Sequence, residues 1–139
     1  MTKPTIRHLA IMSRDTDKLA QFYKDVFEME EIHRSKGVDG IPGVYLSDGY
    51  LTLAILPCSL KRESPQGFNH FGFTIDDTEK YSQRLVEYGL EEAQPRPSNR
   101  PYAEHRACDP DGNLFDLSEH GFEEVEYSAE RKARAKEIA

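Results

Sequence analysis

The chain has 139 residues, of which 37% are hydrophobic and 31% are charged, and it carries a formal net charge of −7. This length suits a single domain, and the acidic balance argues against nonspecific binding to nucleic acid, which requires a basic surface. The longest apolar run, residues 51 to 57, is too short to span a bilayer, and the first residues lack the apolar stretch of a signal peptide. We therefore expect a cytoplasmic protein without nucleic-acid or membrane partners.

A weak internal repeat with an offset of 62 residues organises the sequence. Residues 15 to 21 align with residues 77 to 83, and five of these seven pairs are identical or chemically close. The same offset places His8 on His70. Both histidines lie in stretches of alternating side chains, so each half is predicted to open with a strand that carries a histidine on one face.

A helix is predicted to follow each of these strands. In the first half, Asp15 or Thr16 can cap the first turn of the helix. Apolar side chains then recur with helical spacing at Leu19, Phe22, Tyr23, Val26 and Phe27. The counterpart in the second half begins near Asp77 and runs to Gly89, a residue type that favours the position after a helix.

After each helix the pattern returns to short extended stretches separated by turn residues. Six such stretches are predicted, at residues 30–34, 43–47, 50–56, 91–94, 102–108 and 113–118. The chain is therefore predicted to fold as two tandem βαβββ modules of the α+β class, within one domain of residues 1–139. The predicted parts are module one at 5–57, a linker at 58–66, module two at 67–122 and a tail at 123–139, to which we assign no chemistry.

A tight turn precedes the last predicted strand. Pro110 suits its second position and Gly112 can adopt positive φ, so the turn sets the register of the strand that carries Asp116. Together with the two strand histidines, the Asp-Pro-Asp-Gly-Asn sequence at residues 109 to 113 resembles a known family. This is the glyoxalase, bleomycin-resistance and extradiol dioxygenase family, also called the vicinal oxygen chelate (VOC) superfamily, and the resemblance covers residues 5 to 122.

The resemblance implies a curved, barrel-like mixed sheet that forms a cup, with the helices outside. It also implies that His8, His70 and Asp116 bind a divalent metal ion. The usual carboxylate ligand of the family at the last position is a glutamate, so Asp116 is one methylene shorter. Glu119 is the competing carboxylate, but an odd spacing along a strand turns it to the opposite face from Asp116, which is therefore favoured.

A ligand set of two histidines and one carboxylate resembles the facial triad of non-haem Fe(II) oxygenases, which leaves positions open for substrate and oxygen. The 62-residue offset maps Asp116 to Ala54 in module one, and a one-residue adjustment gives Leu53. Neither residue can bind a metal, so a four-ligand centre is disfavoured. Fe(II) is the favoured ion, with Mn, Ni or Zn as alternatives.

The resemblance implies a metal-dependent enzyme that acts on a small substrate with adjacent oxygen atoms. Dioxygenase-like chemistry is favoured over a glyoxalase-like lyase or isomerase reaction. The alternative is a metal-free binding protein of the bleomycin-resistance type, because a fold by itself does not establish catalysis. Small members of the family commonly form homodimers, and we carry over that expectation.

Several other polar residues are secondary candidates for a place in this site. His105 and Tyr102 could act as a general acid or base, and no further catalytic residue is identified. His33 and His120 could line the pocket. Paired donors for an anionic substrate could come from Arg96, Arg100 and Arg106. The sequence does not distinguish among these arginines.

Overall fold

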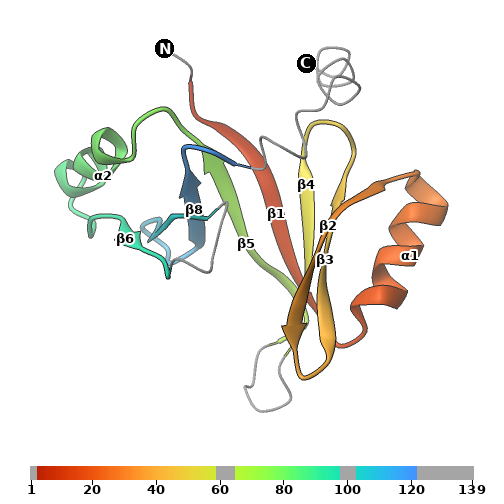
Figure 1. The fold of residues 1–139 in the computed structure, drawn as a ribbon. Helices are drawn as coiled ribbons and strands as arrows, with labels where there is room; N and C mark the ends of the chain where they lie inside the picture. The colour runs from red at the N-terminus through yellow and green to blue at the C-terminus, as the bar shows by residue number, and fades with distance from the viewer. Residues whose placement is uncertain (1–2, 59–64, 98–102, 122–139) are drawn as a thin grey trace. The chain divides into compact units, whose positions relative to one another are not determined.

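The computed structural model describes residues 3–58, 65–97 and 103–121. The chain divides into two compact units. One unit begins at His8 and runs to Asn69, and the other joins the residues up to Arg7 to the part that begins at His70. Figure 1 labels their helices and strands. The predicted tail at 123–139, and most of the predicted linker, lie outside the described residues.

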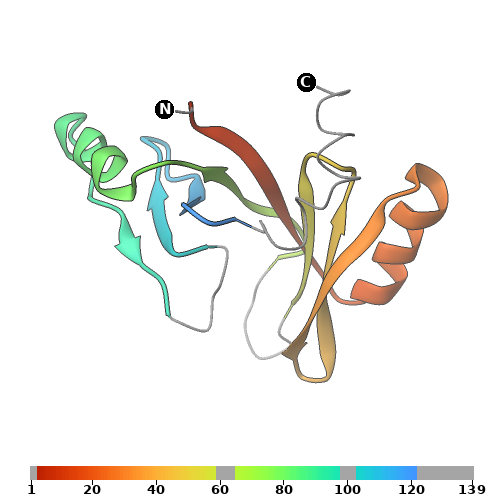
Figure 2. The ribbon, with the colours of Figure 1, turned by 45° about the horizontal axis from the view of Figure 1, so that its top comes forward.

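The first module contains the predicted strand, helix and three strands in the predicted order. Its elements are β1 (Thr5–Ser13), α1 (Thr16–Phe27), β2 (Glu30–Val38), β3 (Ile41–Ser47) and β4 (Thr52–Pro57). The strands are hydrogen-bonded in the order β2-β3-β4-β1, with β1 and β4 parallel and the other two pairs antiparallel. Helix α1 packs against β3 and β4, as the views in Figures 1 and 2 both show.

Helix α1 begins and ends as its sequence dictates. The side chain of Asp15 accepts a hydrogen bond of 3.1 Å from the backbone N–H of Lys18, which satisfies a donor that has no partner within the helix. At the other end Glu28 has a φ of 56°, the left-handed conformation that ends many helices. The predicted helix and its Asp15 cap are thus confirmed. The buried core beside the helix consists of Ala20, Val44, Leu46, Leu53 and Ile55.

The second module repeats this plan. Its elements are β5 (Gly67–Thr74), α2 (Thr78–Glu87), β6 (Gln94–Pro95), β7 (His105–Cys108) and β8 (Leu114–Ser118). The strand order is β5-β8-β7-β6, and β5 and β8 are parallel, as β1 and β4 are in the first module. Asp77 caps α2 and Gly89 follows it with a φ of 93°, both as predicted. The buried core consists of Ile75, Ala93, Ala107, Phe115 and Leu117.

The strands that follow the helices differ from their predicted bounds, and two of the differences have a local cause. The prediction of a strand at 91–94 was wrong, because β6 pairs with β7 only through Gln94 and Pro95. Pro95 and Pro97 have no backbone N–H, which limits the ladder they can form. Strand β2 continues past the predicted residue 34 to Val38, because the next two residues both adopt positive φ in a two-residue hairpin turn.

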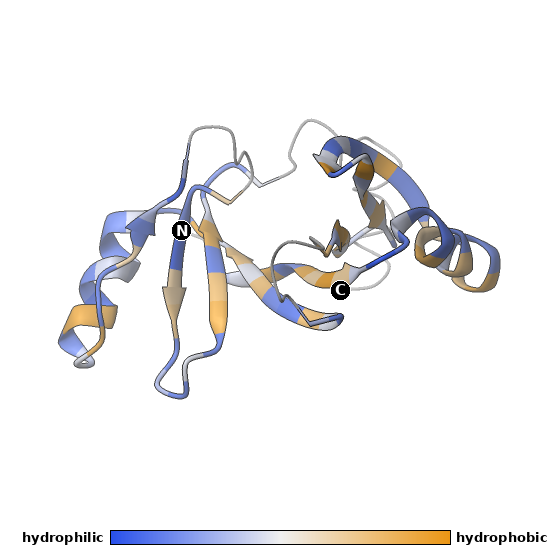
Figure 3. Ribbon diagram, turned by 90° about the horizontal axis from the view of Figure 1, so that it is seen from below, coloured by the Kyte–Doolittle hydropathy of each residue, from blue (hydrophilic) through white to orange (hydrophobic). Residues whose placement is uncertain are grey.

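Hydrophobic residues are concentrated in the strands, whereas the helices carry long hydrophilic stretches (Figure 3). This distribution is expected where strands supply most of the core and each helix covers it with a single face. Among the described residues, no helix is long and apolar enough to cross a membrane.

Candidate metal centre

Strands β5 and β8 bring His70 and Asp116 together. The two strands are parallel, and Asp116 is the register partner of Gly72. His70 lies two residues before Gly72, so the side chains of His70 and Asp116 project from the same face. Residues Phe71, Phe115 and Leu117 project from the other face into the core. The alternation of the strands thus separates a polar face from an apolar one.

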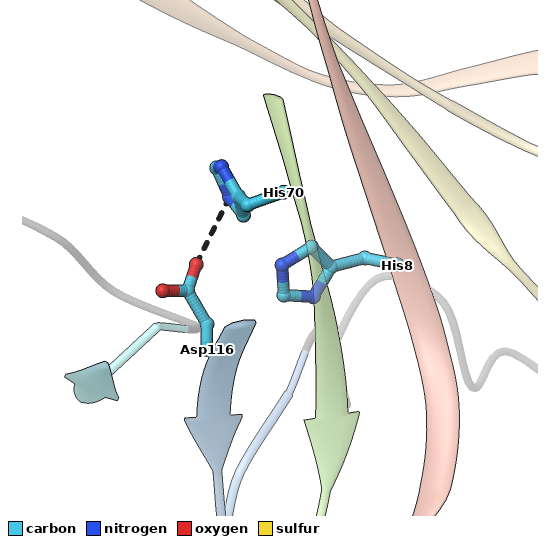
Figure 4. A group of neighbouring side chains, drawn as sticks. All are labelled: His8, His70 and Asp116. Atoms are coloured by element: carbon cyan, nitrogen blue, oxygen red, sulfur yellow. Dashed lines mark ion pairs between the residues drawn. The ribbon is translucent and has the colours of Figure 1, made fainter. Parts of the chain in front are cut away.

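The His70 imidazole and the Asp116 carboxylate are in direct contact. His70 Nε2 lies 3.0 Å from Asp116 Oδ2, and the two side chains are only 8% and 1% exposed. Figure 4 shows the two groups turned toward each other. A carboxylate buried to this degree is stable only with charged or hydrogen-bonding partners, because burial removes its hydration.

The principal partner of Asp116 is Arg106, its cross-strand neighbour on β7. Arg106 Nε donates to Asp116 Oδ1 at 2.7 Å, and Arg106 Nη2 donates to Asp116 Oδ2 at 3.2 Å. The same Nη2 lies 3.5 Å from His70 Nε2. Arginine matches a carboxylate with two parallel donors, so this pair both neutralises Asp116 and fixes its orientation.

His8, in β1, is the third candidate ligand, and it is buried in the compact unit that begins at His8. The 3.0 Å between His70 Nε2 and Asp116 Oδ2 suits two neighbouring ligands of an ion that binds each at about 2.1 Å. Two imidazoles and a carboxylate are also a donor set that Fe, Mn, Ni and Zn accept. The residues present therefore fit a divalent ion.

Glu119, the competing carboxylate, lies apart from this group. It follows the last residue of β8 and is exposed. Its Oε2 accepts a hydrogen bond of 3.1 Å from Thr78 Oγ1 in the first turn of α2. Because β8 ends at Ser118, Glu119 lies outside the strand that carries Asp116.

The secondary catalytic candidates do not join the group in the part of the chain that the structure describes. His105 is paired across the β7–β8 ladder with Leu117, a core residue, so it projects from the face opposite to Asp116. His33 lies on β2 with its ring 5.2 Å from the ring of Tyr45, in the other module. His120 is exposed after β8. Tyr102 lies outside the described residues.

Of the three arginines, the structure singles out Arg106, which the sequence alone did not distinguish. Arg96 lies next to β6, where its backbone N–H donates to the carbonyl of Glu104 at 2.8 Å. Arg100 is outside the described residues. The signal for Arg106 was present in the sequence, because a hairpin centred on the turn at 109–113 pairs residue 106 with residue 116.

The turn itself forms as predicted and holds this register. Asp109 Oδ1 accepts the backbone N–H groups of Asp111 and Asn113, both at 2.9 Å, and Asp109 Oδ2 accepts the side-chain amide of Asn113 at 2.8 Å. The hydrogen bonds from Asn113 are the main reason why the pKa of the Asp109 carboxyl lies below its usual range. Gly112 has a φ of 87°. Asp109 and Asp111 are thus turn formers, in agreement with the sequence.

Comparisons with known proteins place the chain in a family. The family profile described as Glyoxalase/Bleomycin resistance protein/Dioxygenase superfamily matches residues 5–117. The chain is 27% identical over 126 residues to the fosfomycin resistance protein FosX of Listeria monocytogenes serovar 1/2a, which covers 86% of this chain and 92% of the relative.

Solved structures share the fold. One is a methylmalonyl-CoA epimerase in complex with methylmalonyl-CoA, with a TM-score of 0.63 and 20% identity over 84% of this chain and 94% of the epimerase. Another is the 2,3-dioxygenase LapB from Pseudomonas sp. KL28, with a TM-score of 0.61 and 22% identity over 81% of this chain and 39% of LapB. With a matching profile over most of its length, and with the predicted α+β fold, the chain belongs to the glyoxalase/bleomycin resistance protein/dioxygenase superfamily.

Proposed function

We propose that the chain is a metal-dependent enzyme that acts on a small substrate with adjacent oxygen atoms, and that His8, His70 and Asp116 hold the ion. One observation carries this proposal: His70 Nε2 and Asp116 Oδ2, on two buried side chains of metal-ligating types, lie 3.0 Å apart. His8, which the 62-residue repeat pairs with His70, is buried as well. Fe(II) is the favoured ion, because two histidines and one carboxylate are the ligand set of non-haem Fe(II) oxygenases.

Each residue has a defined task in this proposal. His8 and His70 each donate a ring nitrogen as neutral imidazoles, so neither offsets the charge of the ion. Asp116 supplies the one negative charge of the ligand set. An ion held by these residues would keep a net positive charge and would supply Lewis acidity toward two neighbouring oxygens of a bidentate substrate.

Dioxygenase-like chemistry remains our first choice of reaction class, since a three-residue ligand set leaves room for both a substrate and oxygen. In module one, Ala54 is the register partner of Ala10, just as Asp116 is the partner of Gly72 in module two. Ala54 thus supplies no fourth ligand. The likeness to FosX supports a second candidate, the conversion of fosfomycin, a small epoxide phosphonate.

Metal analysis of protein purified without a chelator tests the proposal. We expect close to one equivalent of metal in the wild type and loss of that metal in His8→Ala, His70→Ala and Asp116→Ala. Glu119→Ala is the matched control, which should retain the metal. A wild-type protein that binds no added Fe(II), Mn(II), Ni(II) or Zn(II) would instead support the metal-free binding protein of the bleomycin-resistance type.

A second experiment separates the two reactions. A dioxygenase loaded with Fe(II) should consume dissolved oxygen when a catechol is added, and the Asp116→Ala variant should not. An enzyme of the second type should deplete fosfomycin under nitrogen, without oxygen uptake. From the family resemblance we also propose one cytoplasmic domain that forms a homodimer, which sedimentation analysis of the purified protein can test.

A further inference from the structure

Asp116 already has a cation on its carboxylate, and that cation comes from the chain itself. The Arg106 guanidinium engages both carboxylate oxygens, at 2.7 Å and 3.2 Å. We propose that Arg106 and a divalent ion compete for Asp116, so that Arg106 sets the metal affinity of the centre. This inference rests on the proposed metal site.

The competition follows from which atoms Arg106 contacts. Its Nη2 lies 3.2 Å from Asp116 Oδ2 and 3.5 Å from His70 Nε2, the two atoms that an ion between these residues would bind. Arg106 Nε holds the remaining carboxylate oxygen. A guanidinium does not lose its proton in proteins, so its charge persists and repels a divalent ion placed a few ångströms away.

Of the two partners, Arg106 is the one whose side chain can move away when a metal ion binds. Its side chain is 21% exposed, whereas the Asp116 side chain is 1% exposed and lies in the middle of β8. An arginine can turn its guanidinium toward water while its aliphatic stem stays packed. Asp116 has no comparable freedom, because strand pairing on both sides fixes its backbone. Metal binding would therefore loosen the Arg106 contact with Oδ2 and leave Asp116 in place.

Neutral and charged substitutions of Arg106 test this competition. Chelator-treated protein is titrated with Mn(II) in a calorimeter, for the wild type, Arg106→Met and Arg106→Lys. We expect Arg106→Met to bind Mn(II) about 10-fold more tightly than the wild type, on the scale by which residues behind metal ligands alter affinity. Arg106→Lys keeps the charge and should stay close to the wild type. Arg34→Met, which removes the ion pairs of an arginine with Asp17 and Glu31 in the other module, is the matched control and should leave affinity unchanged.

The thermal midpoint gives a readout that a purely structural role would not produce. Without metal, Arg106→Met should melt below the wild type, because Asp116 loses a buried partner. Saturating Mn(II) should then raise its midpoint by more than it raises that of the wild type. Arg106→Gln, which keeps a donor without the charge, provides the same comparison if Arg106→Met does not fold.

The outcomes separate this inference from the proposed function. Equal or weaker Mn(II) binding in the neutral variants, with a wild type that binds, overturns the competition and makes Arg106 a positioning residue that helps the metal. If Arg106→Met and Arg106→Gln bind Mn(II) and the wild type does not, the competition is supported, because Arg106 then excludes the ion completely. Failure of the wild type and of all variants to bind overturns the metal centre, and the competition with it.

Discussion

Asp116 lies directly opposite Gly72 on two parallel strands, β8 and β5. Because glycine has no side chain, the position next to Asp116 on the face that also carries His70 is small, and His70 Nε2 lies 3.0 Å from Asp116 Oδ2. Gly72 is buried, and a side chain added there would project from the face that carries His70 and Asp116.

Gly72→Val should therefore abolish metal binding. The added side chain projects from the same face as His70 and Asp116, and in a strand it has no freedom to turn to the other face. We expect no bound metal after dialysis against Fe(II) or Mn(II), measured by elemental analysis. Ala107→Val is the matched control, because Ala107 is also buried in a strand of this module but faces the core. Retention of metal by Gly72→Val would mean that His70 and Asp116 do not bind one ion together.

The length of the carboxylate side chain gives a second prediction. Asp116→Glu keeps the charge and restores the glutamate that is usual at this position in the family, so it should bind metal within about 10-fold of the wild type. Asp116→Asn should bind none. It should also lower the free energy of unfolding by about 3 kcal/mol, because Arg106 and His70 lose a buried charged partner. Calorimetric titration and urea unfolding measure the two effects, and strong metal binding by Asp116→Asn would contradict the ligand role.

An acid-sensitive ion pair in the first module gives a third prediction. The Arg34 guanidinium, with help from Lys24, holds the pKa of the Glu31 carboxyl at about 2, below its ordinary 4.5. The unfolded chain therefore takes up this proton more readily than the folded one. The stabilisation by Glu31 is present above pH 4.5 and is lost as the pH falls toward 2. Surface screening keeps its size small, because the Glu31 side chain is 28% exposed.

Glu31→Gln tests this pH dependence through urea midpoints measured at pH 7 and near pH 3. The variant should be less stable than the wild type at pH 7, and the difference should shrink at the lower pH. Glu91 is an exposed glutamate in the other module, and Glu91→Gln is the control. Its urea midpoint should differ from that of the wild type by the same small amount at both pH values. A difference between Glu31→Gln and the wild type that is the same at both pH values would contradict the assignment.

Two glycines with similar backbone angles should differ in their tolerance of alanine. Gly37 has a φ of 70° and Gly112 a φ of 87°, so alanine is strained at both positions by about 1 kcal/mol. At Gly37 the new Cβ would also collide with the backbone carbonyl of Ile41, whereas at Gly112 it would have no described residue within 4 Å apart from its two chain neighbours. We expect Gly37→Ala to cost about 3 kcal/mol in urea unfolding and Gly112→Ala about 1 kcal/mol. Equal losses would show that the hairpin relaxes around the added methyl group.

Much of the fold could be predicted because local sequence signals agreed with one another. The repeat placed Asp15 and Asp77 at equivalent helix starts, and both cap a helix. Alternation within strands assigned His70 and Asp116 to polar faces, and the turn at 109–113 set the register of β8. These features depend on residues close in the chain, where sequence carries most of the information.

One missed part depends on pairing between segments, and two depend on local backbone features. The sequence did not distinguish Arg106 from other arginines, because its role comes from the residue opposite it on another strand. The two-residue length of β6 comes from prolines that limit its ladder, and the extension of β2 comes from positive φ at Asp39 and Gly40. An Asp-Gly pair is a known hairpin signal, so this last feature was accessible from sequence.

The turn at 109–113 makes the proposed centre sensitive to the length of a loop that contains none of its ligands. If one of residues 110–112 were deleted and the same turn re-formed, β8 would slide by one residue against β7. Arg106 would then face Leu117, and Asp116 would turn toward the core, because a slip of one residue exchanges the two faces of a strand. Point substitutions that preserve the turn would leave the centre intact, whereas insertions and deletions would not. The proposed centre therefore depends on the length of this loop as well as on its composition.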